Sequence, residues 1–150
     1  MAQTLANARA GRRRRYRILE HTADVGIEAW GESAPEAFAA AAEATYSLIV
    51  RRRRVRERVE REVAVEGRDA EGLLVNWLLE LLYITEVEGL VFCRFQVHEL
   101  SHTGLRATAF GEPFDPDRHA TGMVIKGVTR HRLEVGPGAG GFRVRAILDI

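Results

Sequence analysis

Cysteine and lysine are almost absent from the sequence. Cys93 is the only cysteine and Lys126 the only lysine among its 150 residues. A single cysteine excludes an internal disulfide and a cysteine-based zinc site within one chain. No apolar run approaches the roughly 20 residues that a membrane-spanning helix needs, and no apolar signal core follows the basic N-terminal segment. We therefore expect a cytoplasmic protein that makes no membrane contact.

Motifs that mark several common enzyme classes are also missing. The sequence contains no Walker loop, no G-x-S-x-G motif and no paired-cysteine motif. These absences disfavour an enzyme that acts alone.

The overall composition is typical of one folded domain, with 46% hydrophobic and 29% charged residues. The net charge of +1 combines +5 in residues 1–15, which hold five arginines and no acid, with −4 in the rest. We expect residues 1–15 to form a flexible basic tail and residues 16–150 to form one domain. A solvated tail is the favoured interpretation, and an RNA-contacting arm is the alternative.

Alternating apolar residues predict strands toward both ends of the chain, and helical periodicity behind capping residues predicts two helices. Strands are expected at 16–20 with a continuation through 25–30, at 59–66, 90–99 and 105–111, and in a terminal hairpin over 125–150; helices are expected from 34 to about 50 and from 70 onward. The second helix has the wider apolar surface and is expected to be the central one. Two helices packed on one face of a largely antiparallel sheet give an α+β two-layer fold.

The segment 51–58 has no apolar face and contains a second arginine run, Arg51 to Arg54. We interpret it as a solvated connection, with RNA binding as the alternative. Because 21 of the 22 basic residues in the whole chain are arginine, a run of arginines is weaker evidence for RNA binding at either segment.

The end of the sequence, Leu148-Asp149-Ile150, continues a strand pattern, so the carboxylates of Asp149 and of the Ile150 main chain are expected to be held in place. Two neighbouring anions repel each other unless a cation intervenes. Arg145 lies four residues away along the strand, which is too far to neutralise both. A hard divalent ion with oxygen ligands is one solution, and Asp24 is a candidate third ligand. The alternative for Asp24 is to cap a turn.

Several separated segments resemble the archease family over residues 16–150. The segments are His21-Thr22-Ala23-Asp24-Val25-Gly26, Gly31-Glu32, Val65-Glu66-Gly67, the leucine-rich stretch 73–82, Gly111-Glu112-Pro113-Phe114-Asp115, Ile125-Lys126-Gly127-Val128-Thr129 and Leu148-Asp149-Ile150. They occur in the order that the family has.

The resemblance implies a cofactor protein of an RtcB-type RNA ligase, which uses GTP and manganese to join RNA ends in tRNA splicing and RNA repair. Archeases promote transfer of GMP to the ligase and allow multiple turnover, so RNA is contacted, if at all, through the ligase. The resemblance also implies a calcium-like ion held by residues that match Asp24, Asp149 and Ile150, and a partner contact at Lys126.

Two other functions are alternatives to a ligase activator. One is a metal-dependent phosphoesterase that uses Asp24 and Asp149 to bind the ion and His21 as the base. The other is a general RNA-binding or chaperone module that works through the arginine runs.

Overall fold

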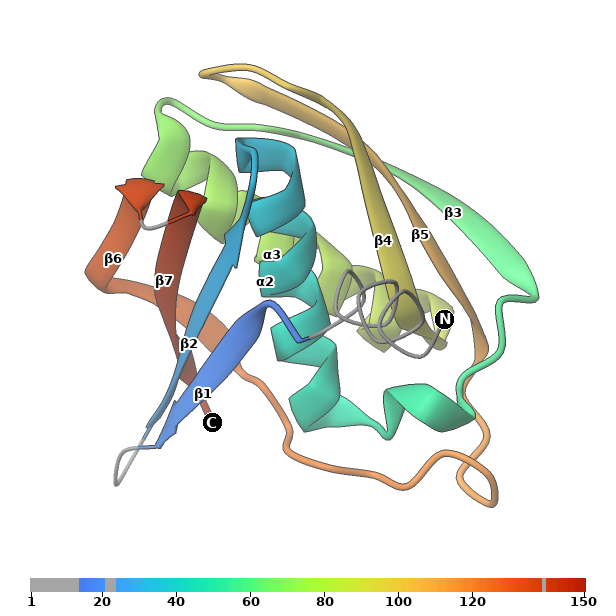
Figure 1. The fold of residues 1–150 in the computed structure, drawn as a ribbon. Coiled ribbons are helices and arrows are strands. Elements are labelled where there is room, and N and C mark those ends of the chain that lie inside the picture. Colours follow the sequence, from blue (N-terminus) through green and yellow to red (C-terminus); the bar gives the residue numbers. More distant parts are fainter. Residues whose placement is uncertain (1–13, 21–23, 139) are drawn as a thin grey trace, which may run out of the picture.

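The computed structural model describes residues 14–20, 24–138 and 140–150. The elements in chain order are β1 (Tyr16–Glu20), β2 (Asp24–Gly31), α2 (Ala34–Ile49), the short 3₁₀ helix η1 (Arg52–Arg54), β3 (Val59–Glu66), α3 (Ala70–Glu88), β4 (Leu90–Leu100), β5 (Gly104–Pro113), β6 (Gly127–Gly138) and β7 (Gly141–Asp149) (Figure 1). None of the helices within these ranges is long and apolar enough to cross a membrane.

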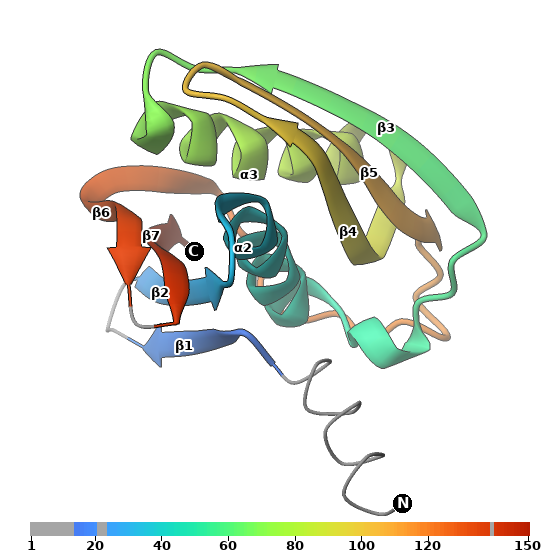
Figure 2. The same ribbon diagram turned by 45° about the horizontal axis from the view of Figure 1, so that its top comes forward.

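The strands of the described ranges form two antiparallel sheets. The first sheet has four strands in the order β1-β2-β7-β6, and the second has three in the order β3-β5-β4. Both helices contact strands of both sheets and lie between them (Figures 1 and 2). The predicted α+β class, with two helices and antiparallel strands, is confirmed, but the strands form two sheets around the helices, where one sheet was expected.

The central helix is α2, which corrects the expectation that the second helix would be central. Its buried side chains surround most of the helix and are mainly small; they are Ala37, Phe38, Ala40, Ala41, Ala42, Ala44, Thr45 and Tyr46. A helix that is apolar nearly all round must be covered on more than one side, and alanines let the covering strands approach closely. By contrast, α3 keeps an exposed face on which Tyr83 is 58% and Val87 61% exposed.

The helix starts follow the capping residues that the sequence indicates. The Ser33 hydroxyl accepts a hydrogen bond from the Glu36 N–H at 3.4 Å, and the Asp69 carboxylate accepts one from the Gly72 N–H at 2.7 Å. Each cap satisfies one N–H group that has no partner within its helix. The helix α3 ends at Gly89, whose φ of 70° is left-handed and favours glycine.

Hydrogen bonds join the two helices through their buried aromatic residues. The Trp77 indole N–H donates to the Phe38 carbonyl at 2.9 Å, and the Tyr46 hydroxyl donates to the Leu81 carbonyl at 2.8 Å. Both aromatic side chains are fully buried, and loss of one such side chain typically costs about 3–5 kcal/mol. These contacts fix α3 against α2 and therefore fix what α3 exposes.

One predicted strand is two strands. Residues 25–30 were expected to continue the strand at 16–20, but β2 runs back along β1, with Glu20 opposite Val25 and Tyr16 opposite Ala29. β1 and β2 are therefore antiparallel neighbours, and residues 21–23 between them lie outside the described ranges. This pairing places the start of β2 at one end of the first sheet.

Candidate functional site

The two strands that carry the predicted aspartates, β2 and β7, lie side by side. β2 pairs with β7 so that Asp24 is directly opposite Asp149, and Gly127 of β6 is opposite Asp149 on its other side. The C-terminal end of the chain thus lies beside the start of β2 (Figure 1). Residues more than 120 positions apart in the sequence meet at one end of one sheet.

Like charges directly opposite each other on paired strands are destabilising, so this pair needs a compensating positive charge. Among the described residues, neither carboxylate takes part in an ion pair, and the Asp24 Oδ1 atom is buried without a hydrogen-bond partner. A buried oxygen in this state costs roughly 1–3 kcal/mol. Within the described residues, nothing compensates the two carboxylates.

Arg145 does not supply that charge. It is opposite Glu28 on one side of β7 and opposite Glu134 on the other, four positions from Asp149. At ~3.3 Å per residue, that separation is about 13 Å along the strand. The expectation that Arg145 is too distant agrees with this register.

The oxygen atoms at this end of the sheet fit a hard divalent ion. Asp24 is half-buried, Asp149 is exposed, and a main-chain oxygen of the half-buried Ile150 adds a third potential donor. Calcium and magnesium prefer such oxygen ligands. Within the described part of the chain, no group of three or more His, Cys, Asp or Glu side chains could hold a metal, so two carboxylates are the side-chain ligands available there. His21 lies outside the described residues.

Lys126 is attached to the same end of the sheet. Its main-chain N–H donates to the Asp149 carbonyl at 2.7 Å, and its side chain is exposed. The four predicted site residues, Asp24, Asp149, Ile150 and Lys126, are therefore brought together by the pairing of β2, β7 and the start of β6.

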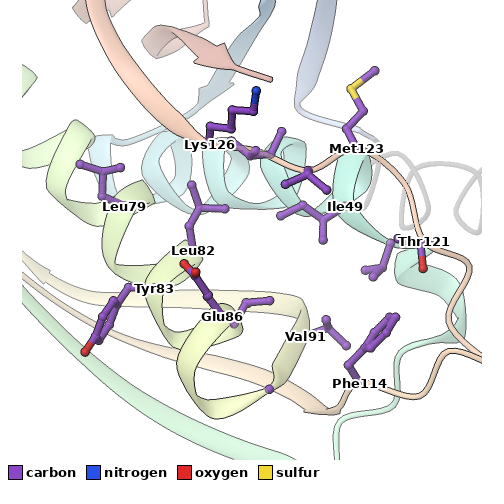
Figure 3. Close-up of a pocket in the computed structure, with 15 residues that line it drawn as sticks. Ile49, Leu79, Leu82, Tyr83, Glu86, Val91, Phe114, Thr121, Met123 and Lys126 are labelled. Atoms are coloured by element: carbon purple, nitrogen blue, oxygen red, sulfur yellow. The ribbon is translucent and has the colours of Figure 1, made fainter.

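Lys126 also stands at the rim of an apolar groove that sequence reasoning missed. The groove has a volume of about 650 Å³ and lies between α3, the end of α2 and the segment 114–126 (Figure 3). The large hydrophobic residues that are most exposed in the described ranges are Leu79, Tyr83, Val87, Phe114, Met123 and Val124, and all except Val87 line this groove. Such a concentration on one surface is typical of an interaction site.

The outer wall of the groove is attached to the end of α2. The N–H groups of Gly122 and Met123 donate to the carbonyls of Ile49 and Leu48, both at 2.7 Å. A Cβ atom on Gly122 would lie 2.1 Å from the Leu48 oxygen, so this close approach requires glycine. The wall thus satisfies carbonyls that the helix end leaves free.

The other end of this wall is held by a buried carboxylate. Glu112 is 0% exposed; its Oε2 accepts hydrogen bonds from the Arg56 N–H at 2.7 Å and from His119 Nε2 at 2.9 Å, and its Oε1 accepts one from Arg118 at 2.6 Å. His119 Nδ1 accepts from the Asp115 N–H at 2.9 Å, so the proton of the neutral ring is on Nε2.

These partners stabilise the ionised form of Glu112. The hydrogen bond from Arg118 is the largest cause, and it lowers the pKa of Glu112 to about 2 although burial acts in the opposite direction. The Glu112 side chain is almost completely buried, and both of its oxygens accept hydrogen bonds from protein groups. We assign it a structural role in holding the segment that follows β5.

Neither the groove nor the Glu112 cluster has a simple sequence signal. The local signs of the cluster are a glutamate followed by Pro113 at the end of a strand and the segment 111–115, which resembles the archease family, and neither predicts the hydrogen bonds of Glu112. The groove joins segments that are distant in the sequence. Its apolar side chains cannot be distinguished from ordinary core residues in the sequence.

Comparisons with known proteins support one family. Residues 16–150 match the model of the Archease protein family (MTH1598/TM1083). The chain is 40% identical over 141 residues to the protein archease of Methanosarcina mazei, covering 91% of this chain and 97% of that protein.

Solved structures show the same fold. The solution structure of protein 1598 of Methanobacterium thermoautotrophicum matches with a TM-score of 0.80 and 31% identity, covering 92% of this chain and all of that one. The crystal structure of a Thermotoga maritima archease, described as a possible chaperone, matches with a TM-score of 0.63 at 19% identity over 88% and 94% of the two chains, which bears on the fold alone. The chain belongs to the archease family.

Proposed function

We propose that this chain is a non-catalytic activator of an RtcB-type tRNA-splicing RNA ligase. In this proposal it promotes guanylylation of the ligase and allows multiple turnover in tRNA splicing and RNA repair. RNA would be contacted through the ligase. Family membership supports the general role, and the single observation that carries the assignment to a site is the direct pairing of Asp24 with Asp149 beside an unpartnered buried oxygen.

In this proposal a divalent ion, calcium by the resemblance, is held by the carboxylates of Asp24 and Asp149 and by a main-chain oxygen of Ile150. When bound, the ion supplies positive charge that neutralises the two carboxylates and can attract phosphate groups. The residues themselves form a fixed acidic surface, because two of them are in register on paired strands. A fixed surface favours recognition, since less conformational entropy is lost on binding.

Lys126 is proposed to contact the ligase or one of its phosphate groups. Its main chain is tied to Asp149, so its exposed amine is kept near the acidic pair while remaining free to reach a partner. A flexible lysine next to a fixed site can bind a phosphate as a point charge.

A multiple-turnover ligation assay tests the proposal. The cognate ligase, GTP and Mn²⁺ are mixed with excess RNA that carries a 2′,3′-cyclic phosphate end and a 5′-hydroxyl end, with and without this chain. We expect product beyond one equivalent of ligase only when the chain is present, together with faster appearance of the guanylylated ligase. Equal turnover in both reactions would contradict the proposal.

The same reactions separate the alternatives. A phosphoesterase would remove the cyclic phosphate in the absence of ligase. A general RNA chaperone would accelerate ligation by an unrelated RNA ligase to the same extent. An activator of the proposed kind does neither.

A further inference from the structure

We propose that the arginines beside Tyr16 form a second binding site, which takes the phosphate backbone of a nucleic-acid strand. The arginine patch is defined here as Arg14 together with Arg51, Arg53 and Arg54. The inference does not depend on ligase activation, because it concerns a different surface and other residues.

The fold brings together two arginine segments that are far apart in the sequence. The guanidinium carbons of Arg14 and Arg52 lie 5.2 and 5.9 Å from the centre of the Tyr16 ring. Tyr16 is only 5% exposed, and the two guanidinium groups lie over its ring. A cavity of about 570 Å³ is lined by Arg14, Tyr16, Glu43 and the run Arg51–Arg54.

The acids at this surface already have partners. Glu36 pairs with Arg15 at 3.2 Å, and Glu43 pairs with Arg52 at 3.8 Å. Within the described ranges, no ion pair involves a member of the arginine patch. Four arginines, all of them exposed, therefore contribute charge that no ion pair of the described residues neutralises, in a chain whose residues 16–150 carry a net negative charge.

The patch is also held in place. The Arg52 side chain donates to the Cys93 carbonyl at 2.8 Å, and Val55, which follows the 3₁₀ turn, is only 7% exposed. The Arg54 carbonyl accepts a hydrogen bond from Arg118 at 3.3 Å. These contacts fix the main chain of η1, and with it the arginines that line the cavity.

The chemistry of the patch points to phosphates rather than bases. Because the Tyr16 ring is covered, the patch offers no exposed aromatic face on which a base could stack. Arginine forks match phosphate oxygens well. A second hollow shares Arg14 and Tyr16 with the first and is also lined by Arg17, Glu28, Trp30 and Arg143. Glu28 pairs there with Arg17 and with Arg143, so the proposed binding rests on the four residues of the arginine patch. We expect binding without sequence preference.

The test measures binding of the full chain to fluorescent 20-nucleotide single strands, U₂₀ RNA and dT₂₀ DNA, by anisotropy between 50 and 300 mM salt. Four neutralised phosphates predict a slope of about −3 for log K against log salt. The variant Arg51→Gln/Arg53→Gln/Arg54→Gln should bind both strands at least about tenfold more weakly at 50 mM salt, and its slope should be smaller in magnitude by about 2.

The matched control is Arg68→Gln/Arg106→Gln/Arg132→Gln, which removes the same net charge from exposed positions elsewhere. It should retain binding within about twofold, and circular dichroism should show that both variants are folded. Equal losses in the two variants would overturn the proposal, because net charge alone would then explain binding. Full binding by the first variant would also overturn it, as would wild-type binding to RNA but not to DNA. If the variant Arg51→Gln/Arg53→Gln/Arg54→Gln loses ligase stimulation but still binds both strands, the proposal is overturned and the patch instead contacts an acidic protein surface.

Discussion

Two carboxylate sites of this chain have opposite environments. Glu112 is completely buried and each of its oxygens accepts hydrogen bonds from protein groups, with Arg118 and His119 among the donors. Asp24 faces Asp149 across two paired strands, and its buried Oδ1 has no partner in the described part of the chain. The first carboxylate has its hydrogen-bond partners within the fold, whereas the second has none among the described residues.

The difference agrees with a structural role for Glu112 and with the proposed binding role of Asp24 and Asp149. A buried carboxylate that already has donors gains nothing from a ligand, and its loss leaves those donors unpaired. Two carboxylates directly opposite each other on paired strands are destabilising, and in the proposed function a bound cation would remove that repulsion. Variants of Glu112 should therefore lower stability and leave activation unchanged, whereas variants of Asp24 or Asp149 should abolish activation without lowering stability.

The largest effect is expected at the acidic pair. Asp24→Asn or Asp149→Asn should abolish stimulation of multiple-turnover ligation. Either variant should also weaken ion binding by more than about 100-fold, because losing a residue that only supports a ligand already costs roughly 10–100-fold. The ion-free variants should be as stable as the wild type or up to about 1 kcal/mol more stable, because the repulsion is removed. Ligation and thermal unfolding in EDTA measure the two effects, and normal turnover by either variant would refute the assigned role.

The next effect concerns the fold. Glu112→Gln should lower the free energy of unfolding by about 3 kcal/mol, because it leaves the half-buried Arg118 and the buried His119 without a charged acceptor. Stimulation per folded molecule should be unchanged. Urea denaturation measures the loss, and Glu60→Gln, at an exposed position on β3, is the control that should stay within about 0.5 kcal/mol.

The Glu112 effect should have a pH signature. The pKa of Glu112 is lowered from 4.5 to about 2 in the folded protein, so its contribution is complete above pH 4.5 and is lost as the pH falls toward 2. The stability difference between the wild type and Glu112→Gln should shrink over this range. A constant difference from pH 6 to pH 2 would contradict the structural role of the charge.

A third effect tests the ion directly. Calcium at 100 times its dissociation constant should stabilise the wild type by about 2.7 kcal/mol, which for a chain of this size raises Tm by roughly 5–10 °C. Glu112→Gln should show the same rise from a lower starting point, and Asp24→Asn should show none. Magnesium in a parallel series identifies which ion the site prefers. A calcium response that persists in Asp24→Asn would place the ion elsewhere.

The smallest effect is expected at Lys126. Lys126→Ala should change the free energy of unfolding by less than about 0.5 kcal/mol, because the side chain is exposed. It should shift the dose response of ligase stimulation to higher concentrations while the calcium-dependent rise in Tm remains. An unchanged dose response would remove Lys126 from the partner contact.

Much of the local structure could be predicted from the residues. Ser33 and Asp69 cap helices as their positions indicate, and the alternation in the last strand continues through Asp149. The reversal between β1 and β2 could not be predicted, because two short apolar runs look the same whether they are collinear or antiparallel. The central position of α2 was missed because leucines suggest a core more strongly than alanines do, although small residues allow the closer packing.

The sequence by itself determined the two helices, most of the strand positions, the family and the four residues Asp24, Asp149, Ile150 and Lys126 as candidates, because these depend on periodicity and on motifs that are local. Only the tertiary structure decided that Asp24 faces Asp149, that Glu112 is buried among donors, and that two arginine runs meet at Tyr16. Those relations depend on strand register and on which helix is enclosed, and both result from packing among segments that are distant in the chain.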